Sequence, residues 1–276
     1  MLNKRILTVQ DISCVGQCSL TVALPIISAC GIETCILPSA VLSTHTGGFT
    51  GFTFCDLTDE MPKILEHWQK EGIRFDALYT GYLGSSRQIG YVLDIADTVL
   101  SEGAPLIVDP AMADNGKLYY GFDEAFVESM KQLVARADIT LPNVTEASFL
   151  TGMDYRETYD EAYVDELIRR LTALGAKKVV MTGIGYTPEE TGVTVYADGV
   201  TRHYSHKKFE KGCHGTGDIY ASAFTGAVMR GKALYDAAVI AADYTLSCIE
   251  ETKKDPEHWY GAVFETSIPK LLQALE

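Results

Sequence analysis

The sequence predicts an α/β fold in three layers, with a mostly parallel central sheet, helices on both faces and a late antiparallel hairpin. Short apolar runs of β-type alternate with longer segments of helical period along most of the 276 residues. Repeated strand–helix units require right-handed crossovers, which place helices on both faces of a parallel sheet. Two later runs alternate around Asp198-Gly199, which is typical of a hairpin.

Each predicted strand is an apolar run that ends at a polar or turn residue, and each predicted helix has helical spacing of apolar residues. The parallel strands are expected at residues 6–9, 33–37, 76–80, 105–108, 138–141 and 178–181, and the hairpin at 192–197 and 200–206. The helices are expected at 19–30, 59–71, 86–100, 122–135, from Pro142-Asn143 onward, and at 163–174, 218–229, 234–250 and 269–275. Ser19 and Asp59 are candidate N-caps, and Gly31 and Gly72 follow the ends of their helices.

Composition limits the classes of partner. The chain carries 37 acidic and 23 basic side chains, a formal net charge of −14, so a nucleic acid would be repelled and none is expected as a partner. No run of about 18 apolar residues suggests a membrane span. The apolar run after Arg5 is too short for a signal-peptide core, and the seven cysteines form no CxxC pair. We therefore expect a cytoplasmic protein with reduced thiols, folded as a single domain over residues 1–276.

Three carboxylates occupy positions where a parallel sheet gathers its functional groups. Asp109 directly follows a predicted strand, Glu146 lies in the first turn after another, and Asp218 begins a helix after a glycine-rich loop. Ligands of such sheets bind beyond the carboxyl ends of the strands. Carboxylates held close together suit Mg²⁺, usually through bridging waters. The alternative for each residue taken singly is an acid that merely opposes a helix dipole.

The strongest local motif is the glycine-rich loop Gly212-Cys213-His214-Gly215-Thr216-Gly217-Asp218. Its glycines let successive N–H groups point into one concavity, and the following helix adds partial positive charge, so the loop predicts an anion hole for phosphate. An acid beside a phosphate is tolerable if it accepts a proton from the attacking hydroxyl. The alternative is a glycine turn with a capping Asp. The chain has no P-loop, protein-kinase catalytic loop or dinucleotide fingerprint.

A polar, glycine-rich and aromatic segment at about 42–55 predicts a mobile flap, because its glycines permit hinge movement while Phe49 and Phe52 could cover a flat ring. An ordinary surface loop is the alternative.

Tyr82 follows a strand end and could stack on a ring or pack on a helix. Cys213 could add reversibly to an aldehyde, although a small side chain in a tight turn is the favoured explanation.

At this point the chain resembles the ribokinase-like superfamily, and within it the pyridoxal kinases of vitamin B6 salvage. The resemblance covers nearly the whole length and rests on segments in the expected order: Thr8-Val9-Gln10 with Gly16, Ser43-Thr44-His45-Thr46-Gly47, Gly81-Tyr82-Leu83-Gly84-Ser85, Asp109-Pro110-Ala111-Met112, Pro142-Asn143-x-x-Glu146, Thr182-Gly183 and Gly215-Thr216-Gly217-Asp218.

This resemblance implies ATP- and Mg²⁺-dependent phosphorylation of the hydroxymethyl group of pyridoxal, pyridoxamine or pyridoxine in pyridoxal 5'-phosphate salvage. It implies Asp218 as the catalytic base, and an anion hole from Gly215, Thr216 and Gly217. Mg²⁺, its waters and the nucleotide would be held by Asp109, Asp114, Asn143, Glu146, Thr182 and Gly183. The ring would be bound by Asp11, His45, Thr46 and Tyr82, together with Asp218. A potassium-type cation and a homodimer are further expectations from the family.

Two departures leave alternatives open. Many pyridoxal kinases carry Ser where this chain has Asp11, and a carboxylate there could bind a protonated ring nitrogen or an amine, or could merely form a local bond. Ala113 also replaces a glycine that is usual in the family. The first alternative is therefore a hydroxymethylpyrimidine kinase of thiamine synthesis. The second is a ligand-binding regulator that keeps the fold without catalysis, although such a protein has no use for a base at Asp218.

Overall fold

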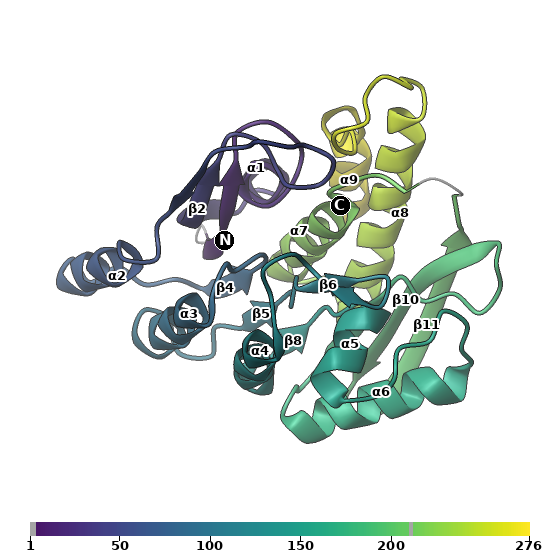
Figure 1. Ribbon diagram of the computed structural model, residues 1–276, viewed down its shortest axis with the longest axis horizontal. Coiled ribbons are helices and arrows are strands. Elements are labelled where there is room, and N and C mark those ends of the chain that lie inside the picture. The colour runs from purple at the N-terminus through teal and green to yellow at the C-terminus, as the bar shows by residue number, and fades with distance from the viewer. Residues whose placement is uncertain (1–3, 210–211) are drawn as a thin grey trace.

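The structure is a computed structural model that describes residues 4–209 and 212–276. Its main sheet has nine strands in the order β11-β10-β9-β8-β5-β4-β1-β2-β3 (Figure 1). The central strands pair in parallel: β1 (Arg5–Ser13), β2 (Glu33–Leu42), β4 (Ala77–Thr80), β5 (Leu106–Val108), β8 (Ile139–Thr140) and β9 (Val179–Thr182). The edges are antiparallel and consist of β3 (Phe54–Asp56) on one side and β10 (Glu190–Ala197) with β11 (Val200–Lys207) on the other. The predicted mostly parallel sheet with a late hairpin is confirmed.

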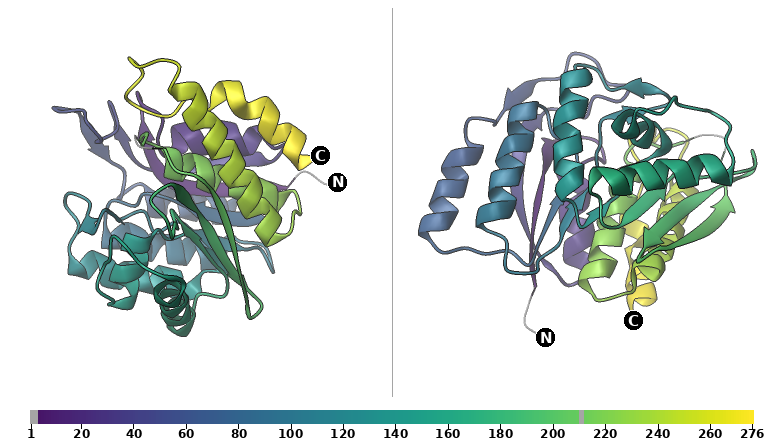
Figure 2. Two further views of the ribbon diagram at one scale, coloured as in Figure 1. Left: turned by 90° about the vertical axis from the view of Figure 1, so that its right-hand side faces the viewer. Right: turned by 90° about the horizontal axis from the view of Figure 1, so that it is seen from below.

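Two hydrophobic cores lie on opposite faces of this sheet, because successive side chains of a strand point to opposite sides. In β1, Leu7 and Val9 belong to one core and Ile6 to the other. The first core is covered by α2 (Met61–Lys70), α3 (Ser86–Thr98), α4 (Glu124–Arg136), α5 (Val144–Thr151) and α6 (Glu161–Leu174). The second is covered by α1 (Leu20–Ala29), α7 (Thr216–Met229), α8 (Leu234–Thr252) and α9 (Ile268–Leu275). Figure 2 shows the two groups of helices on either side of the sheet, which gives the predicted three layers.

Several element ends differ from the prediction. The first two strands continue to Ser13 and Leu42, beyond the polar positions at which the apolar runs stop, because the tertiary structure buries those positions. Helix α2 begins after Glu60, so the prediction that Asp59 caps it is wrong; the Asp59 carboxylate instead pairs with Arg87 at 2.8 Å. Ser19 does stand at the N-cap position of α1, but its side chain makes no capping hydrogen bond.

The prediction omits three short strands. These are β3 and the two-stranded sheet of β6 (Ala113–Asp114) and β7 (Lys117–Leu118). Strands of two or three residues are too short to show a period. The Asn115-Gly116 turn between β6 and β7 has φ values of 50° and 74°, and Asn-Gly is a strong local hairpin signal that could have revealed it.

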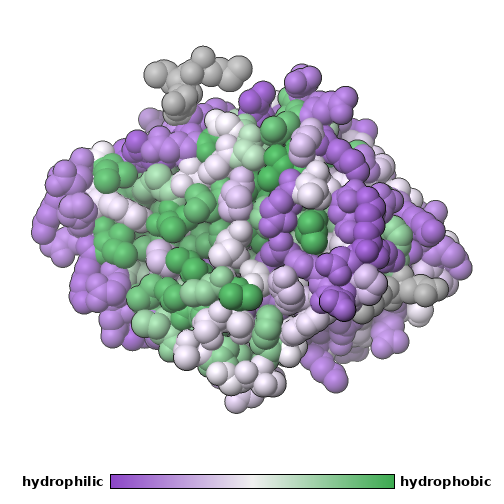
Figure 3. Space-filling model, turned by 90° about the horizontal axis from the view of Figure 1, so that it is seen from above, coloured by the Kyte–Doolittle hydropathy of each residue, from purple (hydrophilic) through white to green (hydrophobic). Residues whose placement is uncertain are grey.

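One face of the molecule carries a hydrophobic patch. Seen from above, hydrophobic residues gather over the region of α1 and β2 (Figure 3). Large exposed side chains in this part of the chain include Val15 at 51%, Leu24 at 37% and Phe54 at 53% exposure. Patches of this kind are candidate contact surfaces. None of the helices within residues 4–209 and 212–276 combines the length and apolarity that a membrane span requires.

Candidate active site

The carboxyl ends of the parallel strands meet at one edge of the sheet and bring the predicted residues to it. Asp109 follows β5, and its N–H donates to the carbonyl of Thr80 at the end of β4. Asn143, which follows β8, forms a parallel bridge with Thr182 at the end of β9. Asp11 lies in the last part of β1. The parallel topology therefore sets these residues side by side although they are far apart in sequence.

Asp109 lies close enough to Glu146 and to Asp218 for the charges of both to act on it. Burial raises the pKa of Asp109 well above its usual range, and the negative charges of Glu146 and Asp218 raise it further. The structure thus gathers the three carboxylates that the sequence singles out. Buried acids without neutralising cations are costly, which marks this cluster as a site for a cation or a proton donor.

Glu146 is also a structural residue of helix α5. Its carboxylate accepts the N–H of Asn143 at 2.9 Å, and the Asn143 side chain accepts the N–H of Glu146 at 2.9 Å, which forms a capping box. The other carboxylate oxygen accepts the N–H of Met112 at 3.2 Å. Burial raises the pKa of Glu146, against these backbone hydrogen bonds. Glu146 therefore does occupy the helix-terminal position that the alternative interpretation predicts. Its carboxylate is at the same time close enough to Asp109 to raise the pKa of that residue.

Asn143 links this helix to the small hairpin. Its side-chain N–H donates to the carbonyl of Ala113 at 2.9 Å, so this hydrogen bond connects the N-terminus of α5 to strand β6. Asp114 lies exposed on that hairpin, where its carboxylate accepts both the backbone and the side-chain N–H of Asn115. Its charge raises the pKa of Glu146, which places it near the cluster. Thr182 is half-buried and Gly183 is exposed at the end of β9.

Asp218 lies in the first turn of α7, where the helix dipole and unbonded N–H groups favour anions. Gly215 is in the left-handed conformation at φ 77°, and its carbonyl accepts the N–H of Ile219, so the amides of Thr216 and Gly217 precede the first helical hydrogen bonds. Burial raises the pKa of Asp218 to about 7, against a hydrogen bond from the N–H of Ser19 and with a further upward contribution from Asp11. A carboxylate with a pKa in this range suits general-base chemistry near neutrality.

The turn between β1 and α1 packs directly on this loop. A Cβ added to Gly215 would lie 1.8 Å from the carbonyl oxygen of Gln17, so only glycine fits. On the other side of the turn, a Cβ on Gly16 would lie 2.0 Å from the ring of His45. The side chain of Gln17 donates to Glu265 at 2.8 Å and meets the ring of His258 at 3.0 Å. We call residues 14–19 the β1–α1 turn.

The glycine-rich segment 43–53 lies against the C-terminal segment 255–262. His45 is buried; its Nδ1 accepts the N–H of Gly47 at 3.0 Å, so its Nε2 carries the proton and donates to the carbonyl of Tyr260 at 2.5 Å. Phe49 packs on Trp259 with ring centroids 4.7 Å apart. Both ring nitrogens of His45 are therefore hydrogen-bonded to backbone groups. Thr46 is exposed. Sequence reasoning missed the C-terminal partner, because no local pattern joins residues this distant.

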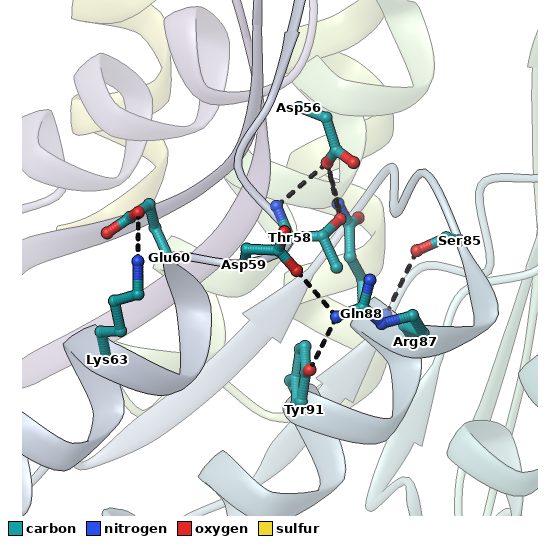
Figure 4. Close-up of polar contacts among 9 residues, drawn as sticks. All are labelled: Asp56, Thr58, Asp59, Glu60, Lys63, Ser85, Arg87, Gln88 and Tyr91. Atoms are coloured by element: carbon teal, nitrogen blue, oxygen red, sulfur yellow. Dashed lines mark hydrogen bonds and ion pairs between the residues drawn. The ribbon is translucent and has the colours of Figure 1, made fainter.

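A buried glutamine ties the base of this segment to the loop that carries Tyr82. Figure 4 shows Gln88 of α3 beside Thr58 and Asp56: the Gln88 side chain donates to Thr58 at 2.8 Å, and Thr58 donates to Asp56 at 2.6 Å. The Gln88 side chain also donates to the carbonyl of Ser39 at 3.1 Å. The side-chain oxygen Oε1 of Gln88 accepts the N–H of Gly84 at 2.7 Å. Tyr82 itself is half-buried, stacks on Phe122 with centroids 5.5 Å apart, and has its pKa raised by burial and by the charge of Asp11.

Cys213 is half-buried and lines a cavity of about 210 Å³ beside the glycine loop, together with Gly212, Thr252, Lys253, Asp255, Pro256, His258 and Trp259.

In the part of the chain that the structure describes, no three His, Cys, Asp or Glu side chains form a metal site by themselves. Mg²⁺ characteristically keeps several waters and binds proteins through one or two carboxylates plus substrate phosphates.

A comparison with protein families matches residues 25–263 to the phosphomethylpyrimidine kinase family. The chain belongs to this family. It is 29% identical over 186 residues to a Bacillus subtilis pyridoxine kinase, and 31% identical over 189 residues to a Bacillus subtilis hydroxymethylpyrimidine/phosphomethylpyrimidine kinase. Each alignment covers 66% of this chain and 66% of the relative, just under two thirds of its length. The predicted resemblance to B6 kinases of the ribokinase-like superfamily is confirmed.

A solved structure from Bacteroides thetaiotaomicron, in an orthorhombic form with pyridoxal, shares the fold of this chain. It has a TM-score of 0.92 and 37% sequence identity, and the comparison covers 98% of this chain and 96% of that one. The likeness therefore extends over the whole architecture, including the strand ends that carry the carboxylates.

The contact between Gly215 and Gln17 predicts a severe effect of Gly215→Ala. The added methyl would collide with the Gln17 carbonyl and would also stand at a positive φ, so we expect a loss of thermal stability that differential scanning calorimetry measures. Gly217→Ala is the matched control, since a Cβ there meets nothing within 4 Å. Equal melting temperatures of the two variants would contradict the proposed packing of the β1–α1 turn on the loop.

Proposed function

We propose that this protein phosphorylates the 5'-hydroxymethyl group of a B6 vitamer, with ATP as the phosphoryl donor. The observation that carries the proposal is the position of Asp218, half-buried in the first turn of a glycine-led helix and close enough to Asp109 for its charge to raise the pKa of that residue. Membership of a kinase family, and the B6 kinases among the relatives, support it.

In the proposed reaction, Asp218 accepts the proton of the substrate hydroxyl. The hydroxymethyl oxygen bonds to the γ-phosphorus while the bond from that phosphorus to the β–γ bridging oxygen breaks and ADP leaves. The amides of Gly215, Thr216 and Gly217 stabilise the charge on the transferring group, since phosphoryl transfer requires chiefly positioning and electrostatic stabilisation. The pKa of Asp218 near 7 lets it hold the proton that it receives.

The nucleotide side is assigned to the strand ends and the β6–β7 hairpin. Asp109 and Glu146 would hold Mg²⁺ through waters, a hard-oxygen donor set that suits this ion, and when bound the ion neutralises phosphate charge. Asn143, Thr182 and Gly183 would contact the phosphates, and Asp114 would face the nucleotide.

The ring side is assigned to Asp11, His45, Thr46 and Tyr82. Asp11 is 5% exposed and accepts a hydrogen bond from Ser13 at 3.0 Å, and it forms no ion pair with any lysine or arginine among the described residues. Burial raises the pKa of Asp11, which means that it destabilises the charged carboxylate. A ligand that brings a positive charge would stabilise that carboxylate. The proposed substrate is therefore a heteroaromatic alcohol with a protonated ring nitrogen or amine.

Hydroxymethylpyrimidine is the second candidate substrate. The family description and the 31% identical relative support it, and an aminopyrimidine also offers N–H donors to Asp11. A coupled ADP-release assay with pyridoxal, pyridoxamine, pyridoxine and hydroxymethylpyrimidine separates the two. Turnover of B6 vitamers with no turnover of the pyrimidine supports the proposal, and the reverse result replaces it. Absence of turnover with all four would indicate a regulator.

Asp218→Asn should lower kcat by on the order of 10²–10⁴, the usual contribution of a positioned acid–base residue. Because the first-turn amides of α7 stay in place, the Kd for ATP should change little. Steady-state kinetics and isothermal titration calorimetry measure the two quantities. A variant with nearly full kcat would remove Asp218 from the mechanism.

The same variant should be more stable than the wild type at pH 8. The pKa of Asp218 is raised in the folded state, so the folded protein binds more protons than the unfolded chain between about pH 4 and 7 and loses stability as the pH rises through that range. Asparagine removes the buried charge and should raise Tm at pH 8, by about 2–4 °C per kcal/mol. The gain should fade toward pH 5, and an equal gain at both pH values would contradict the charge as its cause.

Asp11→Ser should shift preference away from amine-bearing substrates. We expect kcat/KM for pyridoxamine to fall about 10-fold or more relative to pyridoxal, since a hydrogen bond to a charged group is lost. Thr50→Ser, at an exposed position of segment 43–53 to which the proposal assigns no role, is a control for general disturbance. Unaltered ratios of kcat/KM across the panel would refute the role of Asp11.

A further inference from the structure

The turn between β9 and β10 leaves one backbone donor free. Gly183, the first residue after β9, is exposed and has a φ of 70°, a conformation that favours glycine. The N–H of Ile184 donates to the carbonyl of Gly192 at 3.0 Å, whereas the N–H of Gly183 has no acceptor in the described parts of the chain, residues 4–209 and 212–276. A free amide in a glycine turn is a donor that suits a phosphate oxygen.

Tyr159, from the loop between α5 and α6, holds this turn. Its hydroxyl donates to the carbonyl of Gly183 at 3.3 Å and accepts the N–H of Gly185 at 3.4 Å. The carbonyl of Gly183 and the N–H of Ile184 belong to one planar trans peptide and point in opposite directions. That peptide is therefore held at both ends, by Tyr159 and by Gly192. The backbone directly after the free Gly183 amide is fixed as a result.

The start of helix α6 places the Tyr159 side chain. Asp160 caps this helix by accepting the N–H of Tyr163 at 3.0 Å. The ring of Tyr159 stacks on the buried ring of Tyr163, with centroids 5.8 Å apart. Tyr163 also donates to the carbonyl of Asp154 at 2.7 Å, which ties the α5–α6 loop to the same helix. Burial raises the pKa of the Tyr159 hydroxyl, so this group stays protonated near neutral pH and can donate.

Resting on the function proposed above, we propose that Tyr159 is a positioning residue for the phosphates of ATP. Its hydroxyl holds the turn in the conformation in which the N–H of Gly183 is available to a phosphate oxygen. Phenylalanine at this position keeps the ring stack on Tyr163 but loses both hydrogen bonds to the turn. The turn would then have to be ordered when ATP binds, and that ordering would cost affinity.

The test compares Tyr159→Phe with Tyr155→Phe. Tyr155 belongs to the same loop, but its ring lies against Gly116 instead of the turn after β9. In Tyr159→Phe we expect the KM for ATP to rise about 3–10-fold while the KM for pyridoxal stays within about 2-fold, since the lost hydrogen bonds serve the nucleotide side alone. Tyr155→Phe removes a phenol hydroxyl from the same loop and should leave both KM values within about 2-fold of the wild type.

A double-mutant cycle with Gly183→Ala tests whether the effect passes through the Gly183 amide. A Cβ at Gly183 meets nothing within 4 Å, so this variant disturbs the turn through its positive φ and not through a collision. Because both substitutions act on one amide, Tyr159→Phe should raise the KM for ATP less in the Gly183→Ala background than in the wild type. Strictly additive effects would contradict the inference.

A wild-type KM for ATP in Tyr159→Phe would also overturn it, as would an equal rise in the KM of both substrates, which is the result of a general loosening of the fold. A wild-type protein that phosphorylates no member of the substrate panel would instead overturn the proposed function. In that case, calorimetric titration of ATP into the wild type and Tyr159→Phe still tests the positioning role. Weaker binding to the variant would support it, and equal Kd values would refute it. Absence of ATP binding to the wild type would refute both proposals.

Discussion

The contact between the β1–α1 turn and the first residues of α7 is the constraint on which the site depends. The Gln17 carbonyl lies so close to Gly215 that no side chain fits between them, and this sets where α7 begins. The helix start in turn fixes the anion loop and Asp218. Through Gly16 the same turn touches His45, and through the Gln17 side chain it reaches the C-terminal segment, so one short turn sets the relative position of three distant parts of the chain.

The second constraint is the burial of negative charge. Glu146 is supplied with backbone donors in the helix cap, but burial still raises the pKa of its carboxyl group. Burial opposes the ionisation of Asp109 and Asp218 as well, and a neighbouring negative charge adds to it: that of Glu146 and Asp218 at Asp109, and that of Asp11 at Asp218. A protein that keeps such residues sacrifices stability for function, a conflict that is common at active sites. In a kinase, this cost is offset when a cation, a proton or a nucleotide complex occupies the site.

The aromatic and polar contacts around the ring side complete the arrangement. Segment 43–53 is fixed by Phe49 on Trp259 and by His45 on Tyr260, and its far end is tied through Asp56 and Gln88 to the loop of Tyr82. These contacts join the first third of the chain to its last twenty residues. Closure over a ring, as the sequence predicts for this segment, would require movement of the C-terminal segment with it.

The sequence by itself determined the layered sheet, the hairpin at Asp198-Gly199 and the gathering of Asp109, Glu146 and Asp218. Those features follow from local rules: apolar periods define strands and helices, glycine and aspartate shape turns, and parallel strands must end at a common edge. The tertiary structure alone decided that β1 continues through Asp11, that His45 donates to the carbonyl of a residue 215 positions away, and that the Gln17 carbonyl lies against Gly215. Each of those outcomes depends on a partner from a distant segment, and no period or spacing along the chain encodes which distant atoms will meet.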